Sequence, residues 1–171
     1  MRVTAAFNRL LALPGITVRD VLFEPARITV TVALRRRRLV CADCSYSTRA
    51  RYDTRTVNSC WRHLDLGRFR LVVMARLRRI DCPTHGVRTE QVPFARPESG
   101  FTRDVEDLVA WLATRMDKTA VTRLVRIVPA SLTSGSRRLR LALTHQRLSN
   151  SAASIALRSP AKTSRRLSLS P

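Results

Sequence analysis

The sequence predicts an α+β fold, in which a small antiparallel zinc-ribbon-like β domain precedes a partial helix-turn-helix and a disordered basic tail. Three observations lead to this prediction. Two pairs of metal-ligating side chains are embedded in segments that alternate apolar and polar residues, as β-strands do. The period then changes to that of an amphipathic helix. Finally, the acidic residues stop. The expected divisions are a β domain (1–92), a linker (93–100), two helices (101–127) and a tail (128–171).

The chain is strongly basic. Its 171 residues carry a formal net charge of +20, and Lys118 and Lys162 are the only lysines, so arginine supplies nearly all of the positive charge. Such a chain is expected to bind polyanions, first of all nucleic acid, and arginine can hold a phosphate through two hydrogen bonds. A membrane surface is a weaker alternative. A GC-rich genome would also favour arginine codons.

The sequence has no apolar run that is long enough to span a bilayer. Its N-terminus lacks the uninterrupted apolar stretch and the cleavage site of a signal peptide. We therefore expect no membrane partner and a cytoplasmic location, where thiols stay reduced and available for metal.

The first part of the chain is expected to form a helix and a β-hairpin. Residues 5–13 can form a short helix, which Pro14 and Gly15 end. Residues 16–23 are rich in β-branched and apolar side chains, and residues 27–34 alternate apolar with polar ones. These two strands form a hairpin that leads into the first pair of metal ligands.

The two ligand pairs are Cys41 with Cys44 and Cys82 with His85. A gap of two residues lets a tight turn present both ligands to one ion, and two such turns complete a tetrahedral Cys3His site, which suits structural Zn2+. Because the core is small, a metal has a clear role in stabilising it. One alternative is two chance pairs of buried thiols. The other is a disulfide, which a reducing compartment disfavours.

Three side chains between the ligand pairs have predicted roles. Trp61 is expected in the core beside the metal site, and Cys60 is expected to be a small buried side chain. His63 is a stray candidate ligand, but one ligand set is already complete without it. The other interpretation is a hydrogen bond between His63 and Asp65.

Residues 68–80 alternate apolar and basic side chains and are expected to form one strand that ends at the second ligand pair, from which residues 87–92 return. Ligand turns at the tips of antiparallel strands are typical of a zinc ribbon. The arginines outside this core are either a solvated surface or phosphate contacts anchored beside a rigid site. The candidate DNA contacts are Arg35, Arg36, Arg37, Arg38, Arg76, Arg78, Arg79 and Arg123.

Beyond the proline-containing linker, two short helices are expected within residues 101–127. Thr102 is a suitable N-cap, followed by acidic residues in the first turns. The second helix should cover residues 119–127. The tight junction resembles the start of a helix-turn-helix, although by pattern alone any helical hairpin looks the same. The predicted apolar stripes are Phe101, Val105, Leu108, Val109, Leu112 and Met116, then Ala120, Val121, Leu124 and Val125.

The tail, residues 128–171, contains basic residues but no acidic one and is rich in serine, alanine and leucine. This composition predicts disorder. One interpretation is a basic tail that clamps nucleic acid without sequence preference. The interpretation that we favour is out-of-frame translation of a GC-rich gene.

Several blocks are similar to the N-terminal region of ISL3-family bacterial insertion-sequence transposases. They are LVCADC (39–44), WRHLDL (61–66), CPTHGV (82–87), EQVPFARP (90–97) and the helical stretch 101–127, and together they span roughly the first 127 residues. Members carry a zinc-binding domain, a helix-turn-helix and a large DDE catalytic domain whose acidic triad binds divalent metal.

The resemblance implies that the four Cys and His ligands bind zinc and that residues 119–127 match the helix before the recognition helix. It also implies that this region recognises double-stranded DNA, namely the terminal inverted repeats of the element. The match stops there, because no recognition helix is recognisable after residue 127. Residues 128–171 contain no Asp or Glu, so they cannot supply the carboxylates of two-metal phosphoryl transfer.

We therefore expect no enzyme activity and interpret the chain as a truncated or frameshifted copy. The leading hypothesis is a zinc-stabilised, DNA-binding fragment of a transposase. The alternatives are a module that pairs with a full-length transposase and inhibits it, or a non-functional remnant. Substitution of the arginine run (35–38) would abolish inhibition under the first hypothesis and spare it under the second.

Overall fold

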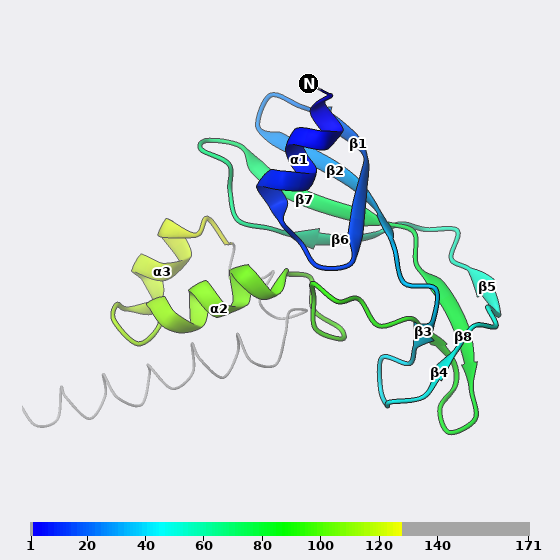
Figure 1. Ribbon diagram of the computed structural model, residues 1–171. Helices are drawn as coiled ribbons and strands as arrows, with labels where there is room; N and C mark the ends of the chain where they lie inside the picture. The colour runs from blue at the N-terminus through cyan, green and yellow to red at the C-terminus, as the bar shows by residue number, and fades with distance from the viewer. Residues whose placement is uncertain (1, 128–171) are drawn as a thin grey trace, which may run out of the picture.

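The computed structural model describes residues 2–127, and these residues confirm the predicted α+β class (Figure 1). The tail predicted to be disordered, residues 128–171, lies outside the described residues. Within residues 2–127, no helix is long and apolar enough to cross a membrane. In chain order the elements are α1 (Val3–Leu11), β1 (Ile16–Phe23), β2 (Arg27–Leu34), β3 (Leu39–Val40), β4 (Ser47–Thr48), β5 (Asp53–Thr54), β6 (Ser59–Arg62), β7 (Arg70–Ala75), β8 (Arg78–Cys82), β9 (Gly86–Thr89), α2 (Arg103–Leu112) and α3 (Lys118–Leu124).

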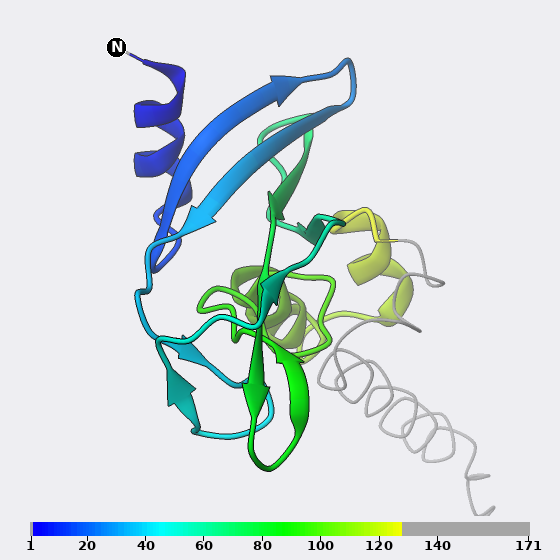
Figure 2. The same cartoon turned by 90° about the vertical axis from the view of Figure 1, so that its right-hand side faces the viewer.

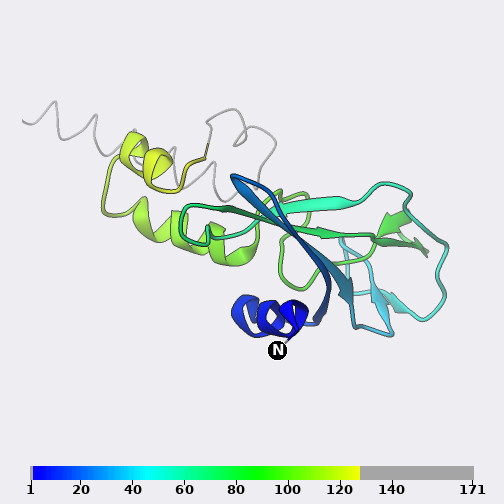
Figure 3. The ribbon, with the colours of Figure 1, turned by 90° about the horizontal axis from the view of Figure 1, so that it is seen from above.

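The largest sheet has the strand order β1-β2-β7-β6. Its first two strands form the predicted hairpin, with the predicted bounds and with a β-bulge between Val18 and Asp20. β7 runs parallel to β2 and antiparallel to β6. Figure 3 shows α1 covering one face of this sheet, where Phe7 and Leu11 join the buried core.

Burial in this sheet follows the alternation seen in the sequence, because successive side chains of a strand point to opposite faces. Trp61 of β6 is buried as predicted, but it packs edge-to-face on Phe94, with ring centroids 5.1 Å apart, in the core of the large sheet. The prediction that Cys60 is buried is wrong. Its thiol is exposed, since it directly precedes Trp61 and points to the opposite face of β6.

The single strand predicted over residues 68–80 is two strands in two different sheets. β7 pairs with β2 and β6, and β8 pairs with β5 and β9. Arg76 and Leu77 lie between them, and the alternation of burial continues through the buried Leu77. The two-residue alternation therefore could not show that the chain pairs with different strands before and after Arg76 and Leu77.

The smaller sheets β3-β4 and β5-β8-β9 form the ribbon that carries the predicted metal ligands. An isolated bridge between Cys41 and Glu90 also joins the segments after β3 and β9. Figure 2 shows this ribbon below the large sheet, with the β8–β9 hairpin at its tip. Its small core consists of Leu39, Cys41, Ile80 and Cys82.

The two helices pack on each other beside the β part. Their buried cluster includes Phe101, Val105, Val109, Leu112 and Val121, all of them predicted. The prediction was wrong for three other apolar residues: Leu108 is 36% exposed, Leu124 is 62% exposed, and Ala120 is also exposed. Each of them lies outside the narrow contact between the two short helices. The apolar residues of each helix therefore predict a wider buried surface than the helices form.

Residues 93–100 were predicted to be a linker. They form no helix or regular strand, but they are packed. Phe94 and Ala95 are both 1% exposed and belong to the core of the large sheet. This segment therefore fastens the helices to the β part.

Candidate metal centre and nucleic-acid interface

The structure brings Cys41, Cys44, Cys82 and His85 together. Their ligand atoms all lie within 4.8 Å of one another. The Cys44 and Cys82 sulfurs are 3.6 Å apart, and the Cys82 sulfur is 3.7 Å from Nδ1 of His85. Around a tetrahedral zinc ion with Zn–S bonds of about 2.3 Å, neighbouring sulfurs lie about 3.8 Å apart. The donor set and its spacing therefore fit one tetrahedral metal ion.

The β8–β9 hairpin positions the second ligand pair. Cys82 and Gly86 are register partners at its tip, and Gly86 has φ +67°, a left-handed conformation that favours glycine. This tight turn places Cys82 and His85 on the same side. Cys41 and Cys82 are buried, whereas Cys44 and His85 are half-buried. The three cysteines of the cluster and Cys60 are all free thiols, so the structure contains no disulfide between the ligand pairs.

The thiols of the cluster differ in acidity. Burial acts to raise the pKa of Cys82, but hydrogen bonds from the His85 side chain and from the His85 and Thr84 backbones outweigh it and lower that pKa to about 6. A backbone hydrogen bond from Tyr46 acts to lower the pKa of Cys44, but burial and the neighbouring thiols raise it. The lowered pKa of Cys82 favours its thiolate, and thiolate is the form that binds metal.

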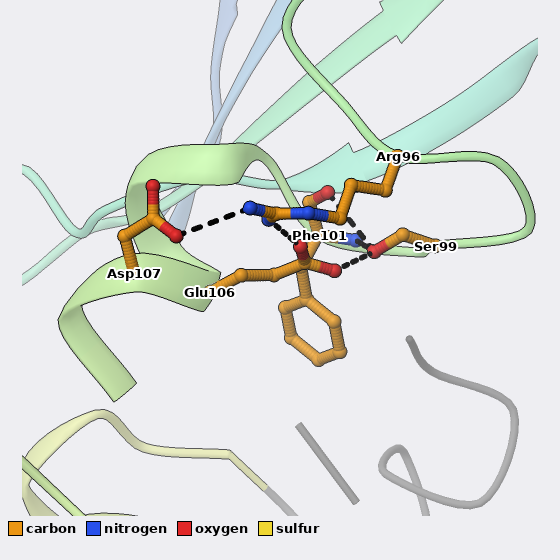
Figure 4. A network of polar contacts seen from close by, with 5 residues as sticks. All are labelled: Arg96, Ser99, Phe101, Glu106 and Asp107. Atoms are coloured by element: carbon orange, nitrogen blue, oxygen red, sulfur yellow. Dashed lines mark hydrogen bonds and ion pairs between the residues drawn. The ribbon is translucent and has the colours of Figure 1, made fainter. Parts of the chain in front are cut away.

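A second polar cluster joins the packed segment 93–100 to α2 (Figure 4). Glu106 is 1% exposed, and its carboxylate pairs with Arg96 and accepts a hydrogen bond of 2.6 Å from the Ser99 hydroxyl. Arg96 also reaches Asp107 at 3.3 Å, and the Phe101 N–H donates to the Ser99 oxygen at 3.0 Å. A buried carboxylate is tolerated only when it is paired and hydrogen-bonded. The sequence pattern did not indicate this network.

His63 forms another contact between the β part and α2. Its Nδ1 lies 2.8 Å from the Thr102 hydroxyl, so Thr102 occupies the N-cap position without making a side-chain cap bond. The predicted bond between His63 and Asp65 is absent, since Asp65 pairs with Arg62 at 2.5 Å. Burial lowers the pKa of His63, and Asp104, at 3.9 Å, opposes this shift. His63 lies outside the ligand cluster.

The arginine run that follows β2 is exposed along its whole length. The Arg35 Nε donates to the Thr17 hydroxyl at 2.6 Å, and an Arg38 Nη donates to the Ser47 hydroxyl at 3.3 Å. Four other predicted DNA contacts are also exposed, and their guanidinium groups make no hydrogen bond or ion pair within residues 2–127. These are Arg36, Arg37, Arg76 and Arg123.

The other two candidate DNA contacts are held by carboxylates of the ribbon. The Arg78 guanidinium donates two hydrogen bonds to the buried Glu90 carboxylate, at 2.9 and 2.6 Å, and the Arg78 backbone N–H donates a third at 2.8 Å. Arg79 forms a two-point ion pair with Asp53, its register partner on β5. The structure therefore uses both arginines to join strands. Sequence reasoning could not find these pairs, because β5 is short and its register against β8 follows from the fold.

Residues 90–129 match a family model that is described as the helix-turn-helix domain of transposase family ISL3. Two relatives named "Transposase for insertion sequence element IS1557", from Mycobacterium tuberculosis strains CDC 1551 / Oshkosh and ATCC 25618 / H37Rv, are each 38% identical to this chain over 138 residues. The alignment covers 74% of this chain and 30% of each relative, so the chain spans less than a third of their length. No solved structure matches. The resemblance to ISL3-family transposases is confirmed.

Proposed function

We propose that this chain, a relative of ISL3-family transposases, binds double-stranded DNA at the terminal inverted repeats of an insertion sequence. The observation that carries the proposal is the match of residues 90–129 to the family's helix-turn-helix domain. The net charge of +20 supports it, because such a surface attracts a polyanion. The helical part would meet the duplex together with the arginines of the β part.

In this proposal the Cys3His cluster holds a structural zinc ion. Three thiols and an imidazole are the soft and intermediate donors that zinc prefers, whereas magnesium and calcium prefer oxygen. When bound, the metal supplies a cross-link that holds Cys41 and Cys44 against the β8–β9 hairpin. Four protein ligands complete a tetrahedron, so the site serves stability and leaves no position for a reacting water.

The proposed DNA contacts are electrostatic. Arginines that neutralise phosphates release condensed counterions, so the affinity falls steeply with salt. Arg36, Arg37, Arg76 and Arg123 are exposed and have no counter-charge within residues 2–127. Their neighbours in the run, Arg35 and Arg38, are partly held by hydroxyls. Arg78 and Arg79 would contribute their charge while they hold the ribbon strands together.

We also propose that residues 1–171 carry recognition without strand cutting. Among the described residues, seven carboxylates are paired with arginine, and none of them belongs to the Cys3His cluster: Glu24, Asp43, Asp53, Asp65, Glu90, Glu106 and Asp107. Residues 128–171 contain no acidic side chain. By occupying the repeats, the chain would compete with a full-length transposase, which would be its second partner.

The double variant R36Q/R37Q tests the DNA contacts. Two lost phosphate contacts should lower the slope of log affinity against log salt by about 0.9 each. Binding of a labelled duplex across a salt series measures this slope. The matched control is R9Q, because Arg9 is exposed on α1, which covers one face of the sheet and is separate from the arginine run after β2. Identical slopes for wild type, control and double variant would contradict the assignment.

A further inference from the structure

A cavity of about 530 Å³ lies at the end of the large sheet where β2 and β7 begin. Its walls come from three parts of the chain that are far apart in sequence: the turn before β2, the start of β7 and the segment after α3. Four guanidinium groups and one carboxylate line this cavity. The charged lining residues are Glu24, Arg27, Arg68, Arg70 and Arg126.

The topology explains why arginines meet here. Parallel strands begin at the same edge of a sheet, and Arg27 and Arg70 are register partners on β2 and β7. Like charges opposite each other on neighbouring strands destabilise a sheet unless a counter-charge is present. The helical part adds a further charge, because Nη1 of Arg126 donates a hydrogen bond of 2.8 Å to the Arg68 carbonyl oxygen.

Some of this charge is already balanced. Glu24 accepts two hydrogen bonds from Arg27, at 2.7 and 2.9 Å, and so binds this guanidinium at two points. Nη1 of Arg126 lies 3.8 Å from the carboxylate of Asp65. Both of these arginines therefore have an acidic neighbour within the fold.

The remaining two arginines are not balanced. The Arg68 guanidinium stacks over the Phe69 ring, 5.1 Å from its centroid, and this contact fixes the guanidinium without neutralising it. The Arg70 side chain is exposed and has no hydrogen bond or ion pair to any of residues 2–127. An anion that enters the cavity would therefore find two guanidinium groups with free N–H donors, and arginine forks suit the oxygens of a phosphate.

We propose that this cavity is a second contact zone for DNA, where Arg68 and Arg70 bind backbone phosphodiester groups. The inference rests on the DNA-binding function proposed above and extends it to two arginines that were not among the predicted DNA contacts. Arg27 and Arg126 shape the site and add positive charge, while the two unbalanced arginines make the contacts.

The spacing of the two zones fits one duplex. The cavity and the arginine run lie at opposite ends of β2, and Arg27 and Arg35 are about 26 Å apart at 3.3 Å per residue. Successive base pairs rise about 3.4 Å, so this span corresponds to roughly eight base pairs. Arg70 begins β7 and Arg76 directly follows it, and the two point to one face because they are six positions apart. The buried residues of β7 point to the other face, which α1 covers.

The test uses the full chain loaded with zinc and a random-sequence duplex. The variant R68Q/R70Q should lower the salt slope by about 0.9 for each lost contact, whereas R70K should keep the contribution of position 70 because it keeps the charge. The control R9Q should leave the slope unchanged. Backbone amide spectra of each variant verify the fold.

The outcomes separate the two proposals. If R36Q/R37Q lowers the slope and R68Q/R70Q does not, the cavity assignment is wrong while the proposed function stands. If the wild-type chain binds neither this duplex nor one that carries a terminal inverted repeat, both proposals fail. A last experiment titrates the chain with inorganic phosphate, and separately with the duplex, at constant ionic strength and follows the NMR signal of the Arg70 side-chain N–H. A shift of this signal with phosphate but not with the duplex would indicate a site for free phosphate and would overturn the assignment to DNA.

Discussion

The substitution C82S is expected to abolish metal binding and unfold the ribbon. Cys82 is buried at the end of β8, and its sulfur lies 3.6 Å from Cys44 and 3.7 Å from His85, so it is central to the ligand cluster. Structural zinc sites supply folding free energy on the order of 10 kcal/mol, and the core of this ribbon is small. Zinc content per chain and the amide resonances of β8 and β9 measure the loss.

The control for this prediction is C60S, because Cys60 is exposed and lies outside the ligand cluster. It should keep one zinc ion per chain and all ribbon resonances. Addition of a chelator to the wild type should reproduce the spectrum of C82S, with the large sheet still folded. A C82S protein that retained one tightly bound zinc ion and an intact ribbon would contradict the assignment.

The substitution R96A is expected to destabilise the chain by about 3 kcal/mol, because it leaves the carboxylate of Glu106 buried without its counter-ion. Glu106 is 1% exposed, and the hydroxyl of Ser99 then remains its one strong partner in this network. The segment that is loosened joins the β part to α2 (Figure 4). Urea denaturation followed by circular dichroism measures the change in the free energy of unfolding.

The matched comparison repeats R96A in an E106Q background. Glutamine keeps the shape of the side chain and removes its charge, so the loss of Arg96 should then cost much less. The difference between the two costs is the coupling free energy of the pair. If R96A costs the same in both backgrounds, the buried charge is not the reason for the destabilisation.

The elements with a strong local signal could be predicted from the sequence. β2 alternates apolar and polar residues, and β1 is rich in β-branched and apolar residues between Gly15 and Pro25, so the bounds of both strands follow from the sequence. The four residues of the Cys3His cluster could be found because spacing within each pair is a local property, and a shared ion would require the pairs to meet. The helix pair was found in the same way, from its period.

Features that depend on pairing across the fold could not be predicted. The alternation of burial continues from Leu71 to Leu77 while the chain passes from one sheet to another. The two-residue period therefore does not show where β7 ends and β8 begins. The ion pair of Arg79 with Asp53 depends on the register of a two-residue strand. The cavity at the start of β7 needs β2 and β7 to be parallel neighbours, which brings Arg27 beside Arg70.

The most direct test of the central claim compares two duplexes of equal length and composition: one carries the terminal inverted repeat of a related insertion sequence, and the other is its shuffled sequence. Binding of the zinc-loaded full chain is measured across a salt series that includes physiological ionic strength. We predict tighter binding of the repeat, a preference that persists at physiological salt and is lost with a chelator. Equal affinities that vanish together as salt rises would contradict the account, because they would show electrostatic contact without recognition.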